Sequence, residues 1–449
     1  MQTTVPFKKK PFRLAAIVMP ILITQVALYM ITFFDILMTG RYDTYHLAGV
    51  TIGSSFWVPV YTGLAGILMG LTPIIAQLVG ARRNDEVKYS VQQGLYVSIV
   101  LAGVVFLIIR YGVSPILESM PLEDEVRVVA ANYLEAMSLG LFPLFAYTVL
   151  RCFFDALGAT RVSMAIILLS APLTIFTNYL LIYGNWGFPE LGGVGAGYAA
   201  AITYWLIFFI AFGTAWKHSS FSQYRLFNKW GRPSFIRWKE ILFIGVPIGI
   251  AIFVETSIFS AVTLLMSNYS TTVISAHQVA LNFSSLLYMI PLSISMGVTI
   301  LVGQAVGAGQ FRDAKQYSFL AVGLAMAFST LAITILLIFR EQIAALYTTD
   351  VQIIGLASQF LIYAALFQLS DAVQAPVQGS LRGYKDVNMT FIMAIISFWV
   401  IGLPVGYLTA TFTDLGPYGY WVGLIVGLTI GAITLSIRLL HIQKRHIKK

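Results

Sequence analysis

Gln77-Leu-Val-Gly-Ala81 and Gln304-Ala-Val-Gly-Ala308 are two copies of one pattern, 227 positions apart in the chain. Further matches at this offset, or at an offset two residues shorter, are Pro20 with Pro247, Gly70 with Gly297, and 158–164 with 383–389. A nearly constant offset over more than a hundred residues indicates an internal repeat. We therefore expect the two halves of the chain to adopt similar structures.

The composition places this repeat in a membrane. The chain is 58% hydrophobic and 10% charged, with a mean hydropathy of +0.81, and a soluble surface needs more charge than this. About 20 mainly apolar residues span a bilayer. Segments of this kind lie near 14–39, 47–78, 90–109, 128–150, 162–184, 193–216, 241–267, 274–306, 317–339, 352–377, 389–410 and 418–440.

The predicted fold is an all-α integral membrane protein with twelve transmembrane helices in two six-helix lobes. We expect an N-lobe at 1–216, a cytoplasmic basic linker at 217–240 and a C-lobe at 241–449. Because each half has an even number of spans, both halves enter the membrane in the same direction. This predicts a parallel repeat, with the substrate site between the lobes and proline hinges at Pro20 and Pro247.

The basic residues that give the net charge of +9 are divided unequally between the two sides of the membrane. With the N-terminus inside, 24 of the 28 basic residues fall on the cytoplasmic side, among them Lys448 and Lys449 at the end of the chain. This is the positive-inside pattern, which predicts that both termini are cytoplasmic. The basic charge is then explained by topology, and we expect no nucleic-acid partner.

The chain lacks the motifs of common enzymes. It contains no GxxxxGK[ST] loop, its five histidines show no metal-ligand spacing, and Cys152 is its only cysteine. We therefore expect no enzyme activity, no cofactor and no bound metal. Energy for uphill transport would come from an ion gradient or from a separate subunit.

Three acids interrupt the apolar segments: Asp35, Glu255 and Asp371. A carboxylate at membrane depth is costly and usually marks a functional site. Asp35 has no Lys or Arg within a turn or two of its own span except Arg41, so it should take up a proton readily. Charged, it would instead attract a cation. A purely structural role, in which the carboxylate only joins helices by hydrogen bonds, is the alternative for each acid.

These features together resemble the multidrug and toxic compound extrusion (MATE) family, particularly its DinF-like branch. The resemblance covers nearly the whole chain and includes Pro20, Asp35, Gln77-Leu-Val-Gly-Ala81, Asp155-Ala-Leu-Gly-Ala-Thr160 and Glu255. It implies export of diverse, mainly cationic compounds, coupled to inward flow of H⁺ or Na⁺. It also implies that protonation of Asp35 is linked to substrate release and to bending of the first span.

The resemblance indicates two groups of site residues. The N-lobe chamber candidates are Asp35, Thr32, Met69, Thr174 and Asn178. Many relatives have an Asn-x-x-x-Asp pattern where this chain has Thr174 and Asn178, so a relay of two carboxylates is weakened and Asp35 is left as the main titrating group. The candidates for an alternative cation site in the C-lobe are Glu255, Phe259, Tyr288 and Asp371.

We therefore predict a proton-coupled antiporter for cationic amphipathic drugs, acting as a monomer in a plasma membrane, here a bacterial inner membrane. One alternative is Na⁺ coupling through Glu255 and Asp371. A second is a flippase for lipid-linked saccharides, although the spans offer acids and few of the cations that pyrophosphate requires. A passive channel would need a continuous polar pore, which the spans do not show.

Overall fold

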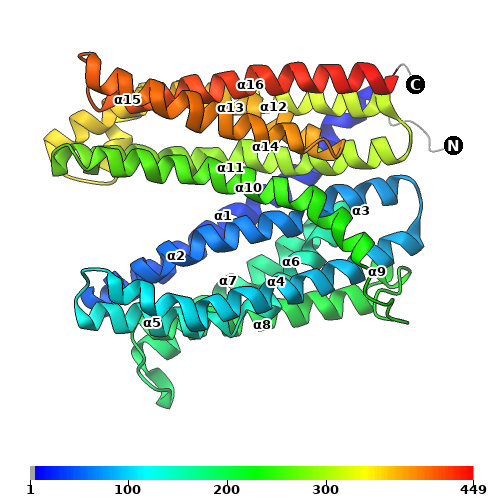
Figure 1. Cartoon of the computed structure of the whole chain (residues 1–449), viewed down its shortest axis with the longest axis horizontal. Coiled ribbons are helices and arrows are strands. Elements are labelled where there is room, and N and C mark those ends of the chain that lie inside the picture. Colours follow the sequence, from blue (N-terminus) through cyan, green and yellow to red (C-terminus); the bar gives the residue numbers. More distant parts are fainter. Residues whose placement is uncertain (1–5, 448–449) are drawn as a thin grey trace. The chain divides into compact units, whose positions relative to one another are not determined.

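The protein is described here by a computed structural model that covers residues 6–447; Lys448 and Lys449 lie outside the described residues. The described part of the chain is built from helices joined by short turns (Figure 1). Eleven of its helices are long and apolar enough to cross a membrane, and a bent pair of shorter helices can form a twelfth span. The all-α membrane fold and the predicted number of spans are thus confirmed.

The helices form two compact units, which are described separately. Unit 2 contains residues 23–249. Its complete helices are α2 (Thr44–Met69), α3 (Leu71–Gly80), α4 (Asn84–Ser119), α5 (Asp124–Ser138), α6 (Leu141–Ala156), α7 (Thr160–Tyr183), the short 3₁₀ turn η2 (Asn185–Gly187), α8 (Gly193–Lys217) and α9 (Ser219–Ser222). The bent pair is α5 and α6, which meet at an angle of 51° and coincide with the predicted fourth span.

Unit 1 contains residues 6–22 and 250–447 among those described. Its complete elements are the 3₁₀ turn η1 (Phe7–Lys9), α11 (Thr271–Gly307), α12 (Phe311–Ala345), α13 (Val351–Gly383), α14 (Asn388–Ala394), the π-helical segment η3 (Ile395–Gly402), α15 (Leu403–Phe412) and α16 (Tyr418–Ile447). Helix α13 is central, because it packs against α11, α12 and α16. The two chain ends lie at one end of this unit (Figure 1).

Two helices are shared between the units: α1 (Lys10–Tyr42) and α10 (Phe235–Met266). The division falls after Leu22 in α1 and after Gly249 in α10. Each division therefore lies two residues beyond a helix-internal proline, Pro20 or Pro247. A proline removes one backbone hydrogen bond and weakens the helix at that point. That Pro20 and Pro247 act as hinges stays a prediction. The structure adds that a boundary between the two units lies next to each of these prolines.

The compact units therefore differ from the expected lobes at these two helices. The first half of α1 packs in unit 1, where Leu14, Ile17 and Val18 belong to a buried cluster with residues of α11. The first half of α10 packs in unit 2, because Gly245 approaches α2 closely. A Cβ atom at Gly245 would lie only 2.1 Å from the carbonyl oxygen of Ile67, so a larger residue would separate the two helices.

The basic linker is held firmly to unit 2 by two glutamines of α4. Gln92 donates to the carbonyl of Leu226 (2.6 Å) and accepts from the backbone N–H of Gly231 (3.0 Å). Gln93 donates to the carbonyl of Arg232 (3.0 Å) and accepts from the backbone N–H of Ser234 and from Nε1 of Trp238, both at 2.9 Å. Both glutamines are at most 1% exposed. The linker is therefore an ordered part of unit 2.

His277 joins helices inside unit 1 and is fully buried. Trp421 Nε1 donates to its Nδ1 (3.1 Å), and its Nε2 lies 3.1 Å from the hydroxyl of Thr263. Because the indole nitrogen can only donate, Nδ1 accepts, and the proton of the neutral ring lies on Nε2. His277 therefore connects α11 with α10 and α16 by hydrogen bonds.

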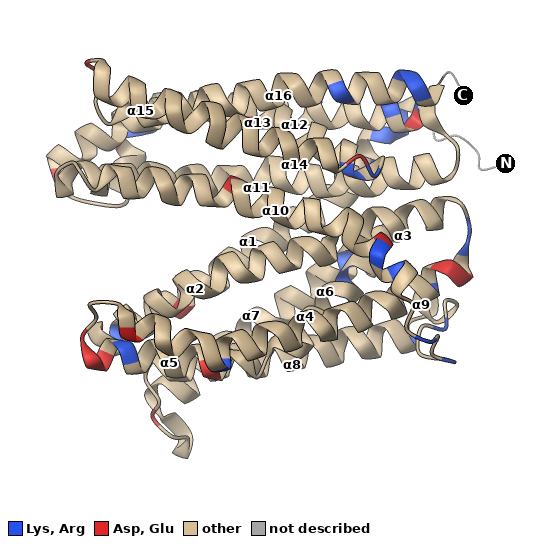
Figure 2. Ribbon diagram, viewed as in Figure 1, with Lys and Arg blue, Asp and Glu red and all other residues tan. Residues whose placement is uncertain are grey.

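Charged residues lie mainly at helix ends and in connections, while the helix middles are almost free of charge (Figure 2). Two basic residues of the predicted cytoplasmic set are less accessible than their sequence positions suggest. Arg151 lies 3.5 Å from Asp155, which also accepts from Ser163 at 2.7 Å. Arg382 is only 7% exposed. Arg151 is half-buried in α6 and Arg382 is buried in α13, so both lie within helices and not in a connecting loop.

Replacing Gln93 by Leu should loosen the linker. The substitution removes three hydrogen bonds, each of which contributes about 1 kcal/mol, so the free energy of unfolding should fall by roughly 3 kcal/mol. Thermal unfolding in detergent measures this loss, and trypsin should cleave faster at Arg225, Lys229 and Arg232. The control is Gln352→Leu at an exposed position of α13. Unchanged cleavage in Gln93→Leu would contradict the proposed role of Gln93.

Candidate functional site

Asp35 lies in the second half of α1, which belongs to unit 2. Its carboxylate accepts a hydrogen bond from Nδ2 of Asn178 on α7, and its backbone carbonyl accepts from the hydroxyl of Thr39 at 2.8 Å. Asp35 forms no ion pair with Lys, Arg or His among residues 6–447. Its side chain is half-buried. The described partner of this acid is thus a neutral amide.

Asn178 is fully buried, and its Oδ1 has no hydrogen-bond partner among the described residues. A buried polar atom without a partner is costly and needs an explanation. Thr174 lies one helical turn earlier on the same face of α7. Its hydroxyl lies 3.2 Å from that of Thr203 on α8 and bonds to the carbonyl of Ser170 at 2.9 Å. The predicted residues Asp35, Thr174 and Asn178 therefore belong to one region of unit 2.

Two tyrosines, Tyr133 and Tyr204, belong to the same region. Asp35 acts electrostatically on the phenol groups of Tyr133 and Tyr204, which places both near the acid. The hydroxyl of Tyr133 lies 3.3 Å from that of Ser54 on α2. From the sequence, aromatic residues of the spans such as Trp57, Tyr61 and Tyr204 are expected to form interface belts or to contact lipid, with a minority lining a cavity. The local sequence does not distinguish these environments.

A stack of three rings, Trp57, Tyr61 and Phe145, lies in the same unit. Trp57 and Tyr61 stack with centroids 5.7 Å apart, and Tyr61 stacks on Phe145 at 6.3 Å. Trp57 is 7% exposed and Phe145 is fully buried. The expectation that Trp57 and Tyr61 form an interface belt is therefore wrong, because their rings pack inward against α6.

The other two chamber candidates lie differently. The hydroxyl of Thr32, one turn before Asp35, bonds to the carbonyl of Leu28 at 3.2 Å, and the residue is exposed. Met69 is the last residue of α2. Asp35 is near the junction of α1 and α2, whereas Met69 is at the far end of α2. With a rise of about 1.5 Å per residue, Asp35 and Met69 lie roughly 25 Å apart along the helix axis. Met69 is still predicted to line the chamber, but at a different depth from Asp35.

All four C-lobe candidates line one cavity of unit 1, with a volume of about 260 Å³. Glu255 and Phe259 come from α10, Tyr288 from α11 and Asp371 from α13. Phe259 packs edge-on against Phe367, with ring centroids 5.7 Å apart. The structure therefore brings together residues that the sequence could only suggest as a group.

The two acids of this cavity have different surroundings. Glu255 accepts a hydrogen bond from Nε2 of Gln378 at 2.8 Å and experiences the positive charge of Arg382. Asp371 is 4% exposed, and its Oδ2 has no hydrogen-bond partner among the described residues. The two carboxylates interact electrostatically. A proton or a small cation between them would relieve this repulsion.

Sequence reasoning missed the polar face of α13. Asp371, Gln374, Gln378 and Arg382 follow one another at intervals of three or four residues, which places them on one side of the helix. Asp371, Gln374 and Gln378 line the cavity, and Arg382 acts on Glu255 from the next turn. This spacing was visible in the sequence, but Arg382 had been counted as a cytoplasmic charge.

The described residues contain no group of three His, Cys, Asp or Glu side chains placed to hold a metal ion. The cavity of unit 1 has two carboxylates with hydroxyl and amide oxygens nearby. Such a set of oxygen donors suits a proton or a monovalent cation better than a zinc-like centre.

The sequence model of the MatE family matches residues 20–180 and again 247–408, so the two matches begin at Pro20 and at Pro247. "Probable multidrug resistance protein NorM" of Halalkalibacterium halodurans is 54% identical over 445 residues, covering 99% of this chain and 97% of that protein. The protein of the same name from Bacillus thuringiensis subsp. konkukian is 52% identical over 446 residues, covering 99% of this chain and 98% of its own.

Among solved structures, the outward-facing conformation of a multidrug resistance MATE family transporter of the MOP superfamily superposes with a TM-score of 0.89. The two chains are 18% identical, and the match covers 98% of this chain and 97% of the other. The relatives carry the name NorM, so the predicted DinF-like branch stays a prediction. The double family match and the full-length relatives show that this chain belongs to the MatE (MATE) family of transporters.

Proposed function

We propose that this protein is a multidrug exporter that exchanges cationic amphipathic compounds for protons by alternating access. The relatives named as multidrug resistance proteins support the export of drugs. The observation that carries the coupling ion is the environment of Asp35, a carboxylate with a neutral amide partner and no basic ion-pair partner among the described residues. We further propose a monomer in a bacterial plasma membrane with both termini in the cytoplasm, acting in transport and not as an enzyme.

A carboxylate in these surroundings can exist in two useful forms. Charged, it attracts an organic cation; neutral, it no longer does so. No Lys or Arg in the described part of the chain forms an ion pair that would hold Asp35 in the charged form. Uptake of one proton would therefore lower the affinity for a bound cation and favour its release.

Asn178 suits both forms of Asp35. Its amide nitrogen donates to the charged carboxylate, while its buried Oδ1 has no described partner. When Asp35 is protonated, a rotation of the amide group would present Oδ1 as the acceptor for the new O–H group. One neutral side chain thus accommodates either state without a change in its own charge, whereas a carboxyl group would have to change its protonation and a lysine could only donate.

The nearby aromatic rings fit the proposed substrates. Tyr133 and Tyr204 lie within electrostatic range of Asp35. Aromatic faces attract organic cations and accept varied apolar shapes. An acid beside such rings would bind compounds that combine a positive charge with an apolar body.

Alternating access needs a change in α1 and α10, because both helices belong to two units. We propose that the bends form at Pro20 and Pro247, where the helices pass from one unit to the other. The two prolines occupy equivalent places in the repeat, so the two bends would be related.

Na⁺ coupling is the second candidate, and the cavity around Glu255 and Asp371 favours it. All four residues predicted for a cation site line this cavity. Against it, Arg382 already places a positive charge near Glu255, which disfavours a second cation there. We therefore keep Asp35 as the coupling site and test the cavity separately.

Asp35→Asn should abolish pH-driven efflux of a fluorescent organic cation from proteoliposomes. The amide cannot gain or lose a proton in the physiological pH range, so the pH gradient can no longer change the charge at this position. Asp414→Asn, an exposed acid in the connection before α16, serves as the matched control and should retain normal efflux. Full efflux in a well-folded Asp35→Asn protein would refute proton coupling at this position.

Asn178→Leu should lower pH-driven efflux about tenfold. The substitution removes the side-chain donor to Asp35, and a hydrogen bond to a charged group contributes about 1.5–3 kcal/mol. Initial efflux rates at several pH values measure the effect. Thr177→Leu, at the half-buried neighbouring position of α7, is the control for a bulky apolar residue in the same helix turn. Equal loss in both variants would show that general packing, and not the amide, is responsible.

Glu255→Gln and Asp371→Asn should each leave pH-driven efflux within about twofold of the wild type. Neither substitution touches Asp35, and each keeps the side-chain volume. A Na⁺ gradient without a pH gradient should drive no efflux in the wild type. If Na⁺ alone drives efflux and Glu255→Gln abolishes it, the cavity of unit 1 is the coupling site.

A further inference from the structure

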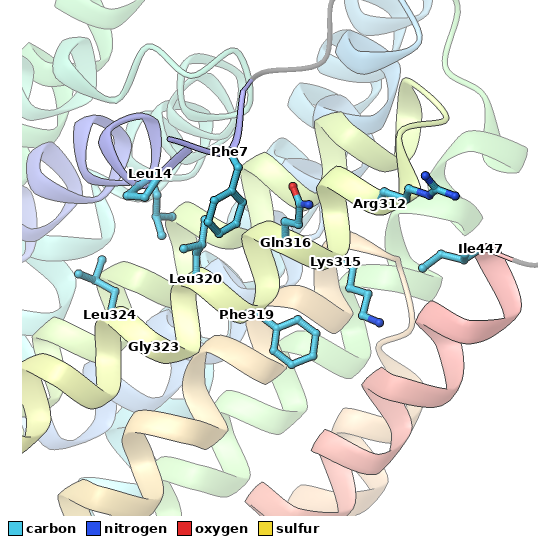
Figure 3. A pocket seen from close by; sticks show the side chains of 11 residues that line it. Phe7, Leu14, Arg312, Lys315, Gln316, Phe319, Leu320, Gly323, Leu324 and Ile447 are labelled. Carbon is cyan, nitrogen blue, oxygen red and sulfur yellow. The ribbon is translucent and has the colours of Figure 1, made fainter. Parts of the chain in front are cut away.

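A second, larger hollow lies at the end of unit 1 where the chain begins and ends. It has a volume of about 670 Å³ and is an open groove between the start of α1 and one face of α12 (Figure 3). The apolar residues of its wall include Leu14, Leu320 and Leu324. A hollow of this size falls within the range of sites for small organic molecules. None of the acids of the coupling sites lines it.

The groove is amphipathic along its length. Arg312 and Lys315 line the part near the start of α12, close to Ile447, whereas Leu14, Gly323 and Leu324 lie at the other end (Figure 3). The eleven residue-to-residue steps from Arg312 to Gly323 correspond to about 16 Å of helix. This is roughly half of the ~30 Å hydrocarbon core of a bilayer. The groove thus has the length of one leaflet, with its charge at the expected cytoplasmic end.

The positive charges of this groove are available to a ligand. Neither Arg312 nor Lys315 forms an ion pair within the described chain, and no acidic residue is among those that line the groove. The nearest acid in sequence, Asp313, is engaged by the buried Lys10 at 2.7 Å. Lys10 also donates to the side-chain oxygen of Gln316. Lys10 therefore neutralises the local acid. The exposed Arg312 and the half-buried Lys315, whose ammonium group lies 5.7 Å from the ring centroid of Phe319, have no acidic partner in the described chain.

We propose that this groove binds one anionic phospholipid, with its phosphate headgroup on Arg312 and Lys315 and an acyl chain along the wall formed by Leu14, Leu320 and Leu324. Charge complementarity supports the headgroup position, because basic pockets at the cytoplasmic ends of membrane helices bind anionic lipid headgroups. The apolar wall supports a lipid over free phosphate, since a small anion would leave that wall unused. The arrangement is independent of the coupling ion.

A lipid in this position would contact both α1 and α12. Phe7, Pro11 and Leu14 belong to the chain start, which is part of unit 1 although the rest of α1 belongs to unit 2. The lipid would therefore stabilise the attachment of the first half of α1. Its expected effect is higher thermal stability of the protein in the presence of anionic lipid.

Native mass spectrometry of the full-length protein in a neutral detergent measures the binding. The probes are phosphatidylglycerol, phosphatidylcholine and inorganic phosphate. One phosphatidylglycerol should remain bound in preference to phosphatidylcholine, and phosphate should not displace it. In Arg312→Gln/Lys315→Gln, affinity for phosphatidylglycerol should fall about thirtyfold, because each basic residue near the surface contributes about a factor of five.

Lys217→Gln/Lys239→Gln removes the same number of charges from exposed positions in unit 2 and should keep the wild-type affinity. A second variant tests the acyl-chain part without changing any charge. A Cβ atom at Gly323 would meet no atom within 4 Å, so Gly323→Leu can fill the groove without a clash. It should lower lipid affinity about tenfold while leaving the lipid-free protein at least as stable, since Leu is a better helix former than Gly.

Gly355→Leu on α13 is the matched control, because Gly355 is also exposed and also has open space around it. It should bind phosphatidylglycerol as the wild type does. The proposal is overturned if the two phospholipids bind equally, if phosphate competes with the lipid, or if either groove variant binds no worse than its matched control.

Discussion

A carboxylate among membrane-spanning helices is tolerated only when its surroundings offset the cost of its charge, and Asp35 illustrates how little this requires. One buried amide, Asn178, supplies the hydrogen bond, and aromatic groups occupy the space nearby. A basic neighbour would stabilise the charged form more strongly, but it would also hold the acid in that form. Because the charged form of Asp35 is stabilised only by this neutral partner, binding of a proton or of an organic cation can determine the charge state of the site. In the proposed transport cycle, this competition is the basis of exchange.

Helix α1 connects the exchange at Asp35 with the other unit, because this helix belongs to both units. Asp35 and Pro20 share α1, and Pro20 lies two residues before the point where α1 passes from unit 1 to unit 2. The first half of α1 is fixed in unit 1 by buried apolar contacts and by the ion pair of Lys10 with Asp313. The linker, in turn, is fixed to unit 2 by Gln92 and Gln93. The proposed bends therefore lie in α1 and α10, the helices shared between the units, and not in the basic linker.

The sequence predicted the helical membrane fold and the number of spans because apolar length is a strong local signal. It also grouped Glu255, Phe259, Tyr288 and Asp371, which line one cavity. It did not predict that α1 and α10 are shared between units, since that depends on close contacts such as Gly245 with Ile67. It misplaced Trp57 and Tyr61 because a ring facing lipid and a ring facing a core have the same local pattern. Arg382 was misjudged for a related reason: its position near a helix end suggested water, whereas tertiary packing buries it beside an acid.

The central claim is that substrate and proton compete for Asp35, and proton release on binding tests it most directly. The purified protein in weakly buffered detergent solution receives a saturating organic cation, and a pH indicator records the protons released. The account predicts about half a proton released per substrate bound at the midpoint of the site's titration, because half of the sites are then protonated, and a release that rises toward one at lower pH. It predicts no release from Asp35→Asn protein that still binds the compound. Undiminished release from the Asp35→Asn protein would contradict the account and place the exchanged proton elsewhere.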